Sequence, residues 1–174
     1  MTRLISTLAA AILAAAVAPA LAQSGPNDAQ IAHIVVTANQ VDIDAGKLAK
    51  EKGANSEVKA FGEQMITDHT GVNKQATALV EKLNVKPEDN DTSRSLKKAG
   101  DENLANLRKL NGAAFDRAYI DHEVVYHQQV VDAIDKTLLP NARNQDLKDL
   151  ITKVRPAIVA HLEHAKEIQK KVGK

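Results

Sequence analysis

The sequence contains no cysteine, and this absence excludes several classes of protein at once. A chain without thiols cannot form disulfides, and it cannot build thiolate zinc sites, iron–sulfur clusters or covalent haem attachments. A lipid anchor on an N-terminal cysteine is excluded for the same reason. Any metal site in this protein must therefore be built without thiolate ligands.

Aromatic residues and an excess of one charge are also missing. The chain has two Phe, two Tyr and no Trp, and its 23 basic residues nearly balance its 22 acidic residues. Nucleic-acid binding depends on a basic surface, with aromatic side chains where single strands stack. The composition therefore predicts no nucleic-acid partner.

Long hydrophobic runs are absent beyond the N-terminus. The first 22 residues combine Arg3, an apolar run and the small-residue pattern Ala20-Leu21-Ala22, which is typical of a cleaved secretory signal peptide. No later run is long and apolar enough to predict a membrane span. We therefore expect a signal peptide over residues 1–22, a single mature domain over residues 23–174 and a periplasmic location.

The feature that is present throughout the mature chain is a helical pattern. Apolar side chains recur with the helical period in four long segments, and no strand-like alternation is found. An asparagine precedes each segment, and asparagine is a favoured N-cap residue. The sequence predicts helices from Asn27 to Gly53, from Asn55 to about Asn84, from Asn111 to Leu139, and from Asn144 onward.

The connection between the second and third of these helices is long, over residues 85–111. Its leucines, among them Leu96 and Leu104, predict a shorter helix interrupted near Gly100. A connection of this length can run along a whole bundle, which would make the second and third long helices parallel. The predicted architecture is all-α, a four-helix bundle with a long crossover that carries an additional short helix.

Each long segment has one potential metal ligand inside its apolar stripe. A buried ionisable side chain is costly unless it is paired, hydrogen-bonded or coordinated. Counted along the helices at 1.5 Å per residue, these side chains fall on two levels only about 6 Å apart. We therefore expect one small volume to be surrounded by Asp42, His69, His127 and His161, with Glu123 at the edge of the third stripe.

The same residues lie in segments with a family resemblance. DIDAGKLA at residues 42–49, EVKAFGEQMITDH at 57–69, AAFDRAYID at 113–121 and HLEHA at 161–165 resemble the bacterial family called domain of unknown function 4142. The resemblance implies a ferritin-like helical bundle in an exported protein, and it supplies no established reaction. It carries over His69, His127 and His161, whereas the family usually has Glu where this chain has Asp42.

The Glu-x-x-His pairs of ferritin-like di-iron enzymes are absent, which disfavours an oxygen-activating di-iron centre. Two functions are left. In the first, the three histidines and Asp42 or Glu123 bind a transition metal ion, and this ligand set suits zinc, iron, copper or nickel. In the second, the chain is a structural or interaction protein of the cell envelope, and the same side chains form a hydrogen-bonded polar layer without metal. No organic cofactor is predicted, and the sequence leaves enzyme activity and oligomeric state open.

Other polar residues near the stripes are expected to have lesser roles. His122 shares a different face of its helix with Tyr119 and Tyr126, so we expect it to pack there or to lie at an interface. His164 lies at the edge of its stripe, where a surface position is expected. Asp68 points off the stripe, so it can support a ligand from outside or face solvent.

Overall fold

A computed structural model of the chain describes residues 25–173, so the predicted signal peptide over residues 1–22 lies outside the described residues. The described chain is all-helical, and none of its helices is long and apolar enough to cross a membrane. In chain order, its helices are α1 (Asp28–Lys52), α2 (Ser56–Lys82), α3 (Asp91–Leu107), α4 (Gly112–Ala133), the π-helical turn η1 (Ile134–Leu138), α5 (Leu139–Asn141) and α6 (Gln145–Val172).

The helices begin where local capping chemistry predicts. Asn27 and Gln30 form a reciprocal capping box at the start of α1, in which the backbone N–H of Gln30 donates to the Asn27 side chain at 2.9 Å. Asn55 and Asn144 cap α2 and α6 through their side-chain oxygens. The predicted starts of these three helices are confirmed.

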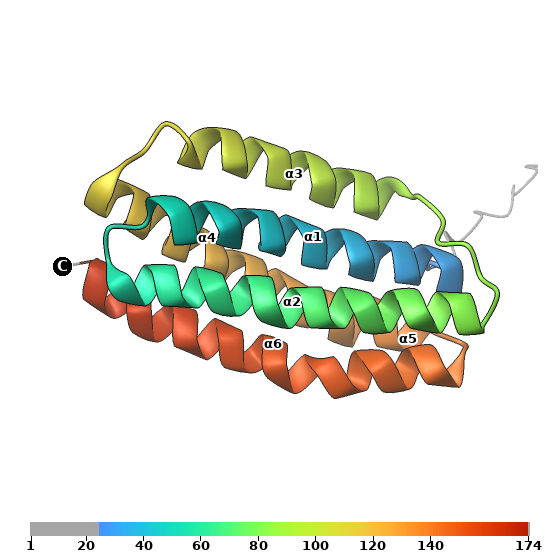
Figure 1. Cartoon of the computed structure of the whole chain (residues 1–174). Coiled ribbons are helices and arrows are strands. Elements are labelled where there is room, and N and C mark those ends of the chain that lie inside the picture. Colours follow the sequence, from blue (N-terminus) through green and yellow to red (C-terminus); the bar gives the residue numbers. More distant parts are fainter. Residues whose placement is uncertain (1–24, 174) are drawn as a thin grey trace, which may run out of the picture.

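The four long helices α1, α2, α4 and α6 lie lengthwise against one another, and α3 lies along the outer side of α1 (Figure 1). The α1–α2 turn and the α3–α4 turn are at the same end of the molecule (Figure 1). The connection from α2 to α4 therefore runs the length of the molecule, and α2 and α4 point in the same direction. This topology brings the middle of all four long helices to one level.

Two details of the predicted helices are wrong. The helix α3 is continuous through Gly100, because this glycine serves close packing and does not break the helix. A Cβ at position 100 would lie 2.7 Å from Val41 Cγ2, so only glycine lets α3 approach α1 so closely. The third long helix also does not end before Pro140: α4 gives way at Ile134 to the π-helical turn, and α5 continues the helical run through Pro140 to Asn141.

The buried apolar residues form two cores. The first, which we call the aromatic core, lies near the α1–α2 turn and consists of Ala45, Ala49, Val58, Phe61, Met65, Leu107, Phe115, Tyr119, Ile120, Ala165 and Ile168. The second, the aliphatic core, lies toward the opposite end and consists of Ile31, Ile34, Val131, Ile134, Leu138, Ala142, Leu147, Ile151 and Ile158. On α1, α4 and α6 the predicted ligands fall between residues of the two cores. On α2, His69 lies between the aromatic core and Leu79, which packs against the aliphatic core.

Candidate metal centre

All five predicted ligands are buried in the layer between the two cores. Their residues are 0–4 % exposed, and each long helix supplies at least one of them: Asp42 from α1, His69 from α2, Glu123 and His127 from α4, and His161 from α6. Burial of ionisable groups at this density requires compensation by hydrogen bonds, opposite charges or a bound ion.

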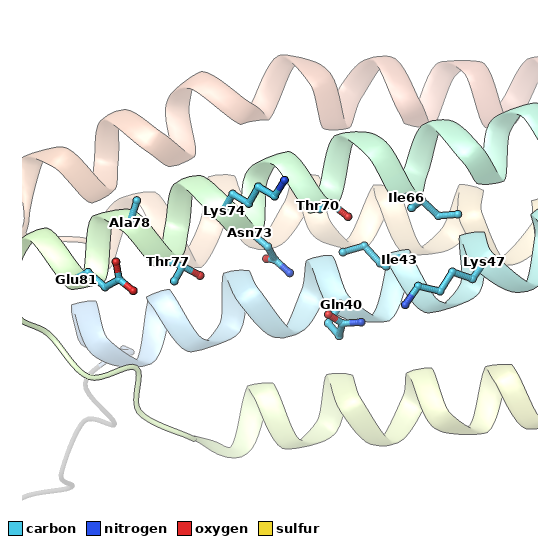
Figure 2. Close-up of a pocket in the computed structure, with 10 residues that line it drawn as sticks. All are labelled: Gln40, Ile43, Lys47, Ile66, Thr70, Asn73, Lys74, Thr77, Ala78 and Glu81. Carbon is cyan, nitrogen blue, oxygen red and sulfur yellow. The ribbon is translucent and has the colours of Figure 1, made fainter.

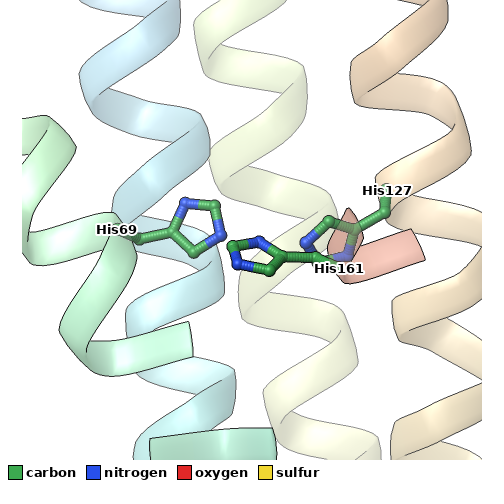
Figure 3. A group of neighbouring side chains, drawn as sticks. All are labelled: His69, His127 and His161. Carbon is green, nitrogen blue, oxygen red and sulfur yellow. The ribbon is translucent and has the colours of Figure 1, made fainter. Parts of the chain in front are cut away.

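The three histidine rings converge on one point. Figure 3 shows His69 and His127 reaching inward from opposite sides, with the ring of His161 between them. The ring centroids are 5.3–5.9 Å apart. One nitrogen from each ring lies within 4.8 Å of the others, a spacing at which the three could share one metal ion.

Asp42 joins this cluster through one carboxylate oxygen. Its Oδ2 lies 2.9 Å from His69 Nε2 and 3.3 Å from His127 Nε2. These distances suit ion pairs, yet none of the three atoms has a partner with hydrogen-bond geometry. A hydrogen bond weakens steeply when the donor does not point at the acceptor, so the short distances alone do not pair these atoms. The three atoms lie close together without being paired.

The outer nitrogen of each imidazole is held by an acceptor. His69 Nδ1 lies 2.6 Å from Asn39 Oδ1, and Asn39 itself is oriented by its Nδ2, which donates to the carbonyl of Val35. His127 Nδ1 faces the backbone carbonyl of Glu123 at 3.0 Å, and His161 Nε2 faces a carboxylate oxygen of Asp68 at 2.9 Å. Because each partner atom is an acceptor, each of these nitrogens carries the ring proton and donates it.

The tautomers leave three inward-facing lone pairs. In a neutral imidazole only one nitrogen is protonated, so His69 Nε2, His127 Nε2 and His161 Nδ1 are the unprotonated ones. These same three atoms are buried and lack a hydrogen-bond partner within the described residues. Histidines that bind metals in proteins are held in this way, with the outer N–H donated to a carbonyl or carboxylate.

Burial favours the neutral form of His127 and His161. It disfavours the imidazolium form of His127 and lowers its pKa to about 4, against the attraction of Asp42. The pKa of His161 is also lowered, mainly by burial. A neutral imidazole is the form that coordinates a metal, so these two rings are suited to binding near pH 7.

The two buried carboxyl groups differ in charge. Burial works against ionisation of Asp42, but attraction to His69 and His127 in their protonated forms outweighs burial and lowers the pKa of Asp42. The pKa of Glu123 is raised well above its usual value, first by burial and then by the charge of Asp42. Glu123 is therefore the more readily protonated of the two groups. Oxygens of these two groups and a nitrogen of His127 form a second set of possible ligands within 4.8 Å.

Residues outside the predicted ligand set also shape the site. Asn39 was not predicted, although it lies three residues before Asp42 and so shares its face of α1. Asp68 is partly exposed and supports His161 from outside the cluster. His122 stacks on Tyr126, with ring centroids 5.6 Å apart, as expected for the other face of α4. His164 is exposed, as expected, and contacts Gln64 at 3.2 Å.

A surface groove lies elsewhere on the molecule. It has a volume of about 500 Å³ and runs between the outer faces of α1 and α2 (Figure 2). Its walls are mostly polar, with residues such as Gln40, Lys74 and Glu81, and none of the five predicted ligands lines it. The groove is therefore separate from the histidine cluster.

The fold and the site define an all-helical protein with buried histidine and carboxylate groups that could hold a metal. The family described as "Domain of unknown function (DUF4142)" matches residues 12–168, which is most of the sequence. The chain belongs to this family, and the resemblance found in the sequence is confirmed.

Among solved structures, the chain is similar to DUF305 from Streptomyces coelicolor, a protein predicted to be secreted. The two share 10 % sequence identity with a TM-score of 0.68, over 83 % of this chain and 92 % of the other. At this identity the likeness concerns the fold alone. No curated protein matches the sequence.

Proposed function

We propose that this protein is an exported, ferritin-like four-helix bundle that binds a transition metal ion. The ion is held by His69, His127 and His161 together with Asp42, and Glu123 lies beside Asp42 and His127 at the edge of the site. The proposal assigns metal binding to the protein and leaves the reaction, if there is one, to be found after the metal is known.

The observation that carries the proposal is the set of three buried imidazole nitrogens without partners. Each lies on a ring whose other nitrogen is already committed to an acceptor. An unpaired buried polar atom costs about 1–3 kcal/mol, so three of them in one small volume call for a common partner. A metal ion is such a partner, because it accepts several lone pairs at one point.

The spacing of the ligand atoms fits a small coordination sphere. In a tetrahedral site with bonds of about 2.0–2.1 Å, neighbouring ligand atoms are about 3.3 Å apart. The two measured separations from Asp42 Oδ2 to His69 Nε2 and His127 Nε2 are 2.9 and 3.3 Å. Three nitrogens and one oxygen suit zinc, iron(II), nickel or copper(II).

The domain boundaries and the location belong to the same proposal. We infer a signal peptide over residues 1–22, cleavage near Gln23 and a single periplasmic domain over residues 23–174. The leader pattern of Arg3, the apolar run and Ala20-Leu21-Ala22 supports this assignment. Mass spectrometry of the protein purified from the periplasm would identify the mature N-terminus.

Elemental analysis of the untagged mature protein, purified from the periplasm without chelator, tests metal binding. We expect close to one metal ion per chain, and its loss in a His69→Ala, His161→Ala double variant. A His33→Ala, His164→Ala double variant is the matched control, because it removes two histidines outside the cluster and should keep the metal. Circular dichroism shows whether each variant is folded.

A second candidate function follows from the carboxyl pair. Oxygens of Glu123 and Asp42 lie within 4.8 Å of each other, and Asp42 also lies close to two histidines, so opposite charges and shared protons could compensate the layer without a metal. Under this alternative the polar layer fixes the register of the helices in a structural or interaction protein of the cell envelope. Metal-free protein that gains no thermal stability from zinc, copper, nickel or anaerobic iron(II) would favour this alternative and refute metal binding.

A further inference from the structure

A cavity of about 200 Å³ lies within the aliphatic core, next to the polar layer. Its walls come from α1, α2, α3, α4, η1 and α6. Aliphatic side chains make up most of the lining, including Ile34, Val130, Ile134, Ile151 and Ile158. No titratable side chain lines it, so the cavity has no means of holding a charged ligand.

Water is a poor occupant of this cavity. A buried water needs two to four polar partners, and dry apolar cavities of about 150 Å³ bind benzene or xenon. Asn39 faces the cavity, but its amide is already committed to Val35 and His69. The other polar lining residues are Thr92, which is exposed, and Thr137, which is half-buried, so they mark the opening of the cavity rather than its interior.

One wall of the cavity is the π-helical turn. Ile134, Thr137 and Leu138 all belong to η1, and all three line the cavity. Such turns are rare, they change the direction in which the following side chains point, and they are frequent at functional sites. The interruption of α4 is therefore located where space has been left open inside the aliphatic core.

We propose that this cavity binds one neutral, apolar small molecule of about the size of benzene or a little larger. The ligand class is an uncharged hydrocarbon or simple aromatic compound, because the inner walls offer mainly dispersion contacts and the two threonine hydroxyls lie toward the opening. Asn39 forms the boundary between this cavity and the histidine cluster, since it lines the cavity and also contacts His69. The proposal concerns a site distinct from the metal ligands and does not depend on metal binding.

Methyl NMR of the full mature protein tests occupancy directly, with benzene and with xenon under pressure as probes. The isoleucines of the aromatic core, Ile120 and Ile168, serve as an internal control because they lie in the other core. We expect saturable shifts of the δ1-methyl signals of Ile34, Ile134, Ile151 and Ile158 and none at the controls. Equal shifts in both cores, or none at the cavity, would overturn the proposal.

Two variants locate the binding space. Ala133→Leu fills the cavity from α4 and should weaken benzene binding at least tenfold, whereas Ala160→Leu makes the same change at an exposed helical position and should not. If Ala133→Leu does not fold, Ile158→Ala provides the converse test, because an enlarged cavity should admit para-xylene more tightly than the natural one does. Unchanged affinities in the folded variants would contradict the assignment.

Metal-free and metal-loaded protein should both bind the apolar probe. Binding in a preparation that contains no metal would leave the cavity proposal standing even if the metal proposal fails. If the protein retains its metal but benzene and xenon produce no shift, the cavity proposal fails and the metal proposal stands. The two proposals are therefore separated by the same set of samples.

Discussion

The two cores on either side of the polar layer are built differently. The aromatic core contains Phe61, Phe115 and Tyr119, whose rings pack edge-to-face and in a stack with centroids 6.2–6.3 Å apart. Close to it, α1 and α2 approach so tightly at Gly46 and Gly62 that a Cβ on either glycine would lie 2.7 Å from the carbonyl oxygen of the other. The buried rings, together with the close approach of the helices at the two glycines, make this end of the molecule closely packed.

The aliphatic core contains no aromatic residue and includes the cavity of about 200 Å³. No glycine is among the residues of this core or of the cavity lining, so branched side chains set the separation of the helices there. The two cores of this helical protein therefore differ in packing. One end is closely packed, the other leaves room for a ligand, and the polar layer lies between them.

The largest effect should come from truncation in the aromatic core. Phe61→Ala removes a completely buried ring and should lower the free energy of unfolding by about 4 kcal/mol. Ile158→Ala in the aliphatic core should cost only about 2 kcal/mol, because a side chain beside an existing cavity has fewer contacts to lose. Urea unfolding measures both variants, and the reverse order would break the comparison between the cores.

The polar layer should make stability depend on pH in the metal-free protein. The pKa of His127 is lowered from 6.5 to about 4 in the folded state, so below pH 6.5 the unfolded chain binds the proton more readily. The contribution of His127 to the free energy of unfolding is therefore fully present above pH 6.5 and is lost as the pH falls to 4. Its upper limit is about 3 kcal/mol.

A His127→Gln variant should lose this part of the pH dependence while keeping the contribution of Glu123. The pKa of Glu123 is raised in the folded state, so its effect on stability is opposite to that of His127. Glu123 destabilises the fold as the pH rises above the usual pKa of a glutamate. The difference between natural and variant protein in urea titrations from pH 7 to pH 4 isolates His127. Parallel curves would show that this ring is not buried in neutral form.

Asn39 lines the cavity of the aliphatic core and also contacts His69 in the polar layer. Replacing it tests how strongly the metal site depends on this boundary residue. Asn39→Ala removes the acceptor that orients His69 and should lower metal affinity about 10–100-fold. Competition with a chelator of known affinity measures the change. Asn73→Ala, in the surface groove between α1 and α2, is the matched control and should bind metal as the natural protein does.

The smallest predicted effects concern glycines in helices. Gly100→Ala places a methyl group 2.7 Å from Val41 Cγ2 and should destabilise the protein by about 1 kcal/mol, since overpacking outweighs the gain in helix propensity. Gly71→Ala has open space around the new methyl group and should stabilise by up to about 1 kcal/mol. Thermal unfolding of the two variants compares them, and equal effects would show that α3 does not pack closely on α1.

Much of the fold could be predicted because its signals are local. Asn27, Asn55 and Asn144 cap helices through bonds to residues two or three positions away, so their effect is visible in the sequence. Gly100 was misread because a glycine inside a helical pattern has the same local signature whether it breaks the helix or permits a close contact. Only the distance to Val41, far away in the chain, separates the two meanings.

The candidate ligands were also visible in the sequence, since burial follows from helical periodicity. Asp42, His69, His127 and His161 each lie in an apolar stripe, and all four are buried in the structure. The sequence did not indicate which nitrogen of each ring faces inward. That depends on the partner of the outer nitrogen, and the partners of His69 and His161 lie on other helices.

The sequence by itself determined an all-helical chain, the starts of its long helices and the kinds of side chain that are buried at its middle. These properties follow from contacts within a few residues of one another. The tertiary structure alone decided that the lone pairs of three histidines meet beside Asp42, that one core is dense and that the other contains a cavity. These properties depend on how whole helices are rotated and how far apart they lie. Packing of many side chains from distant parts of the chain sets that rotation and separation.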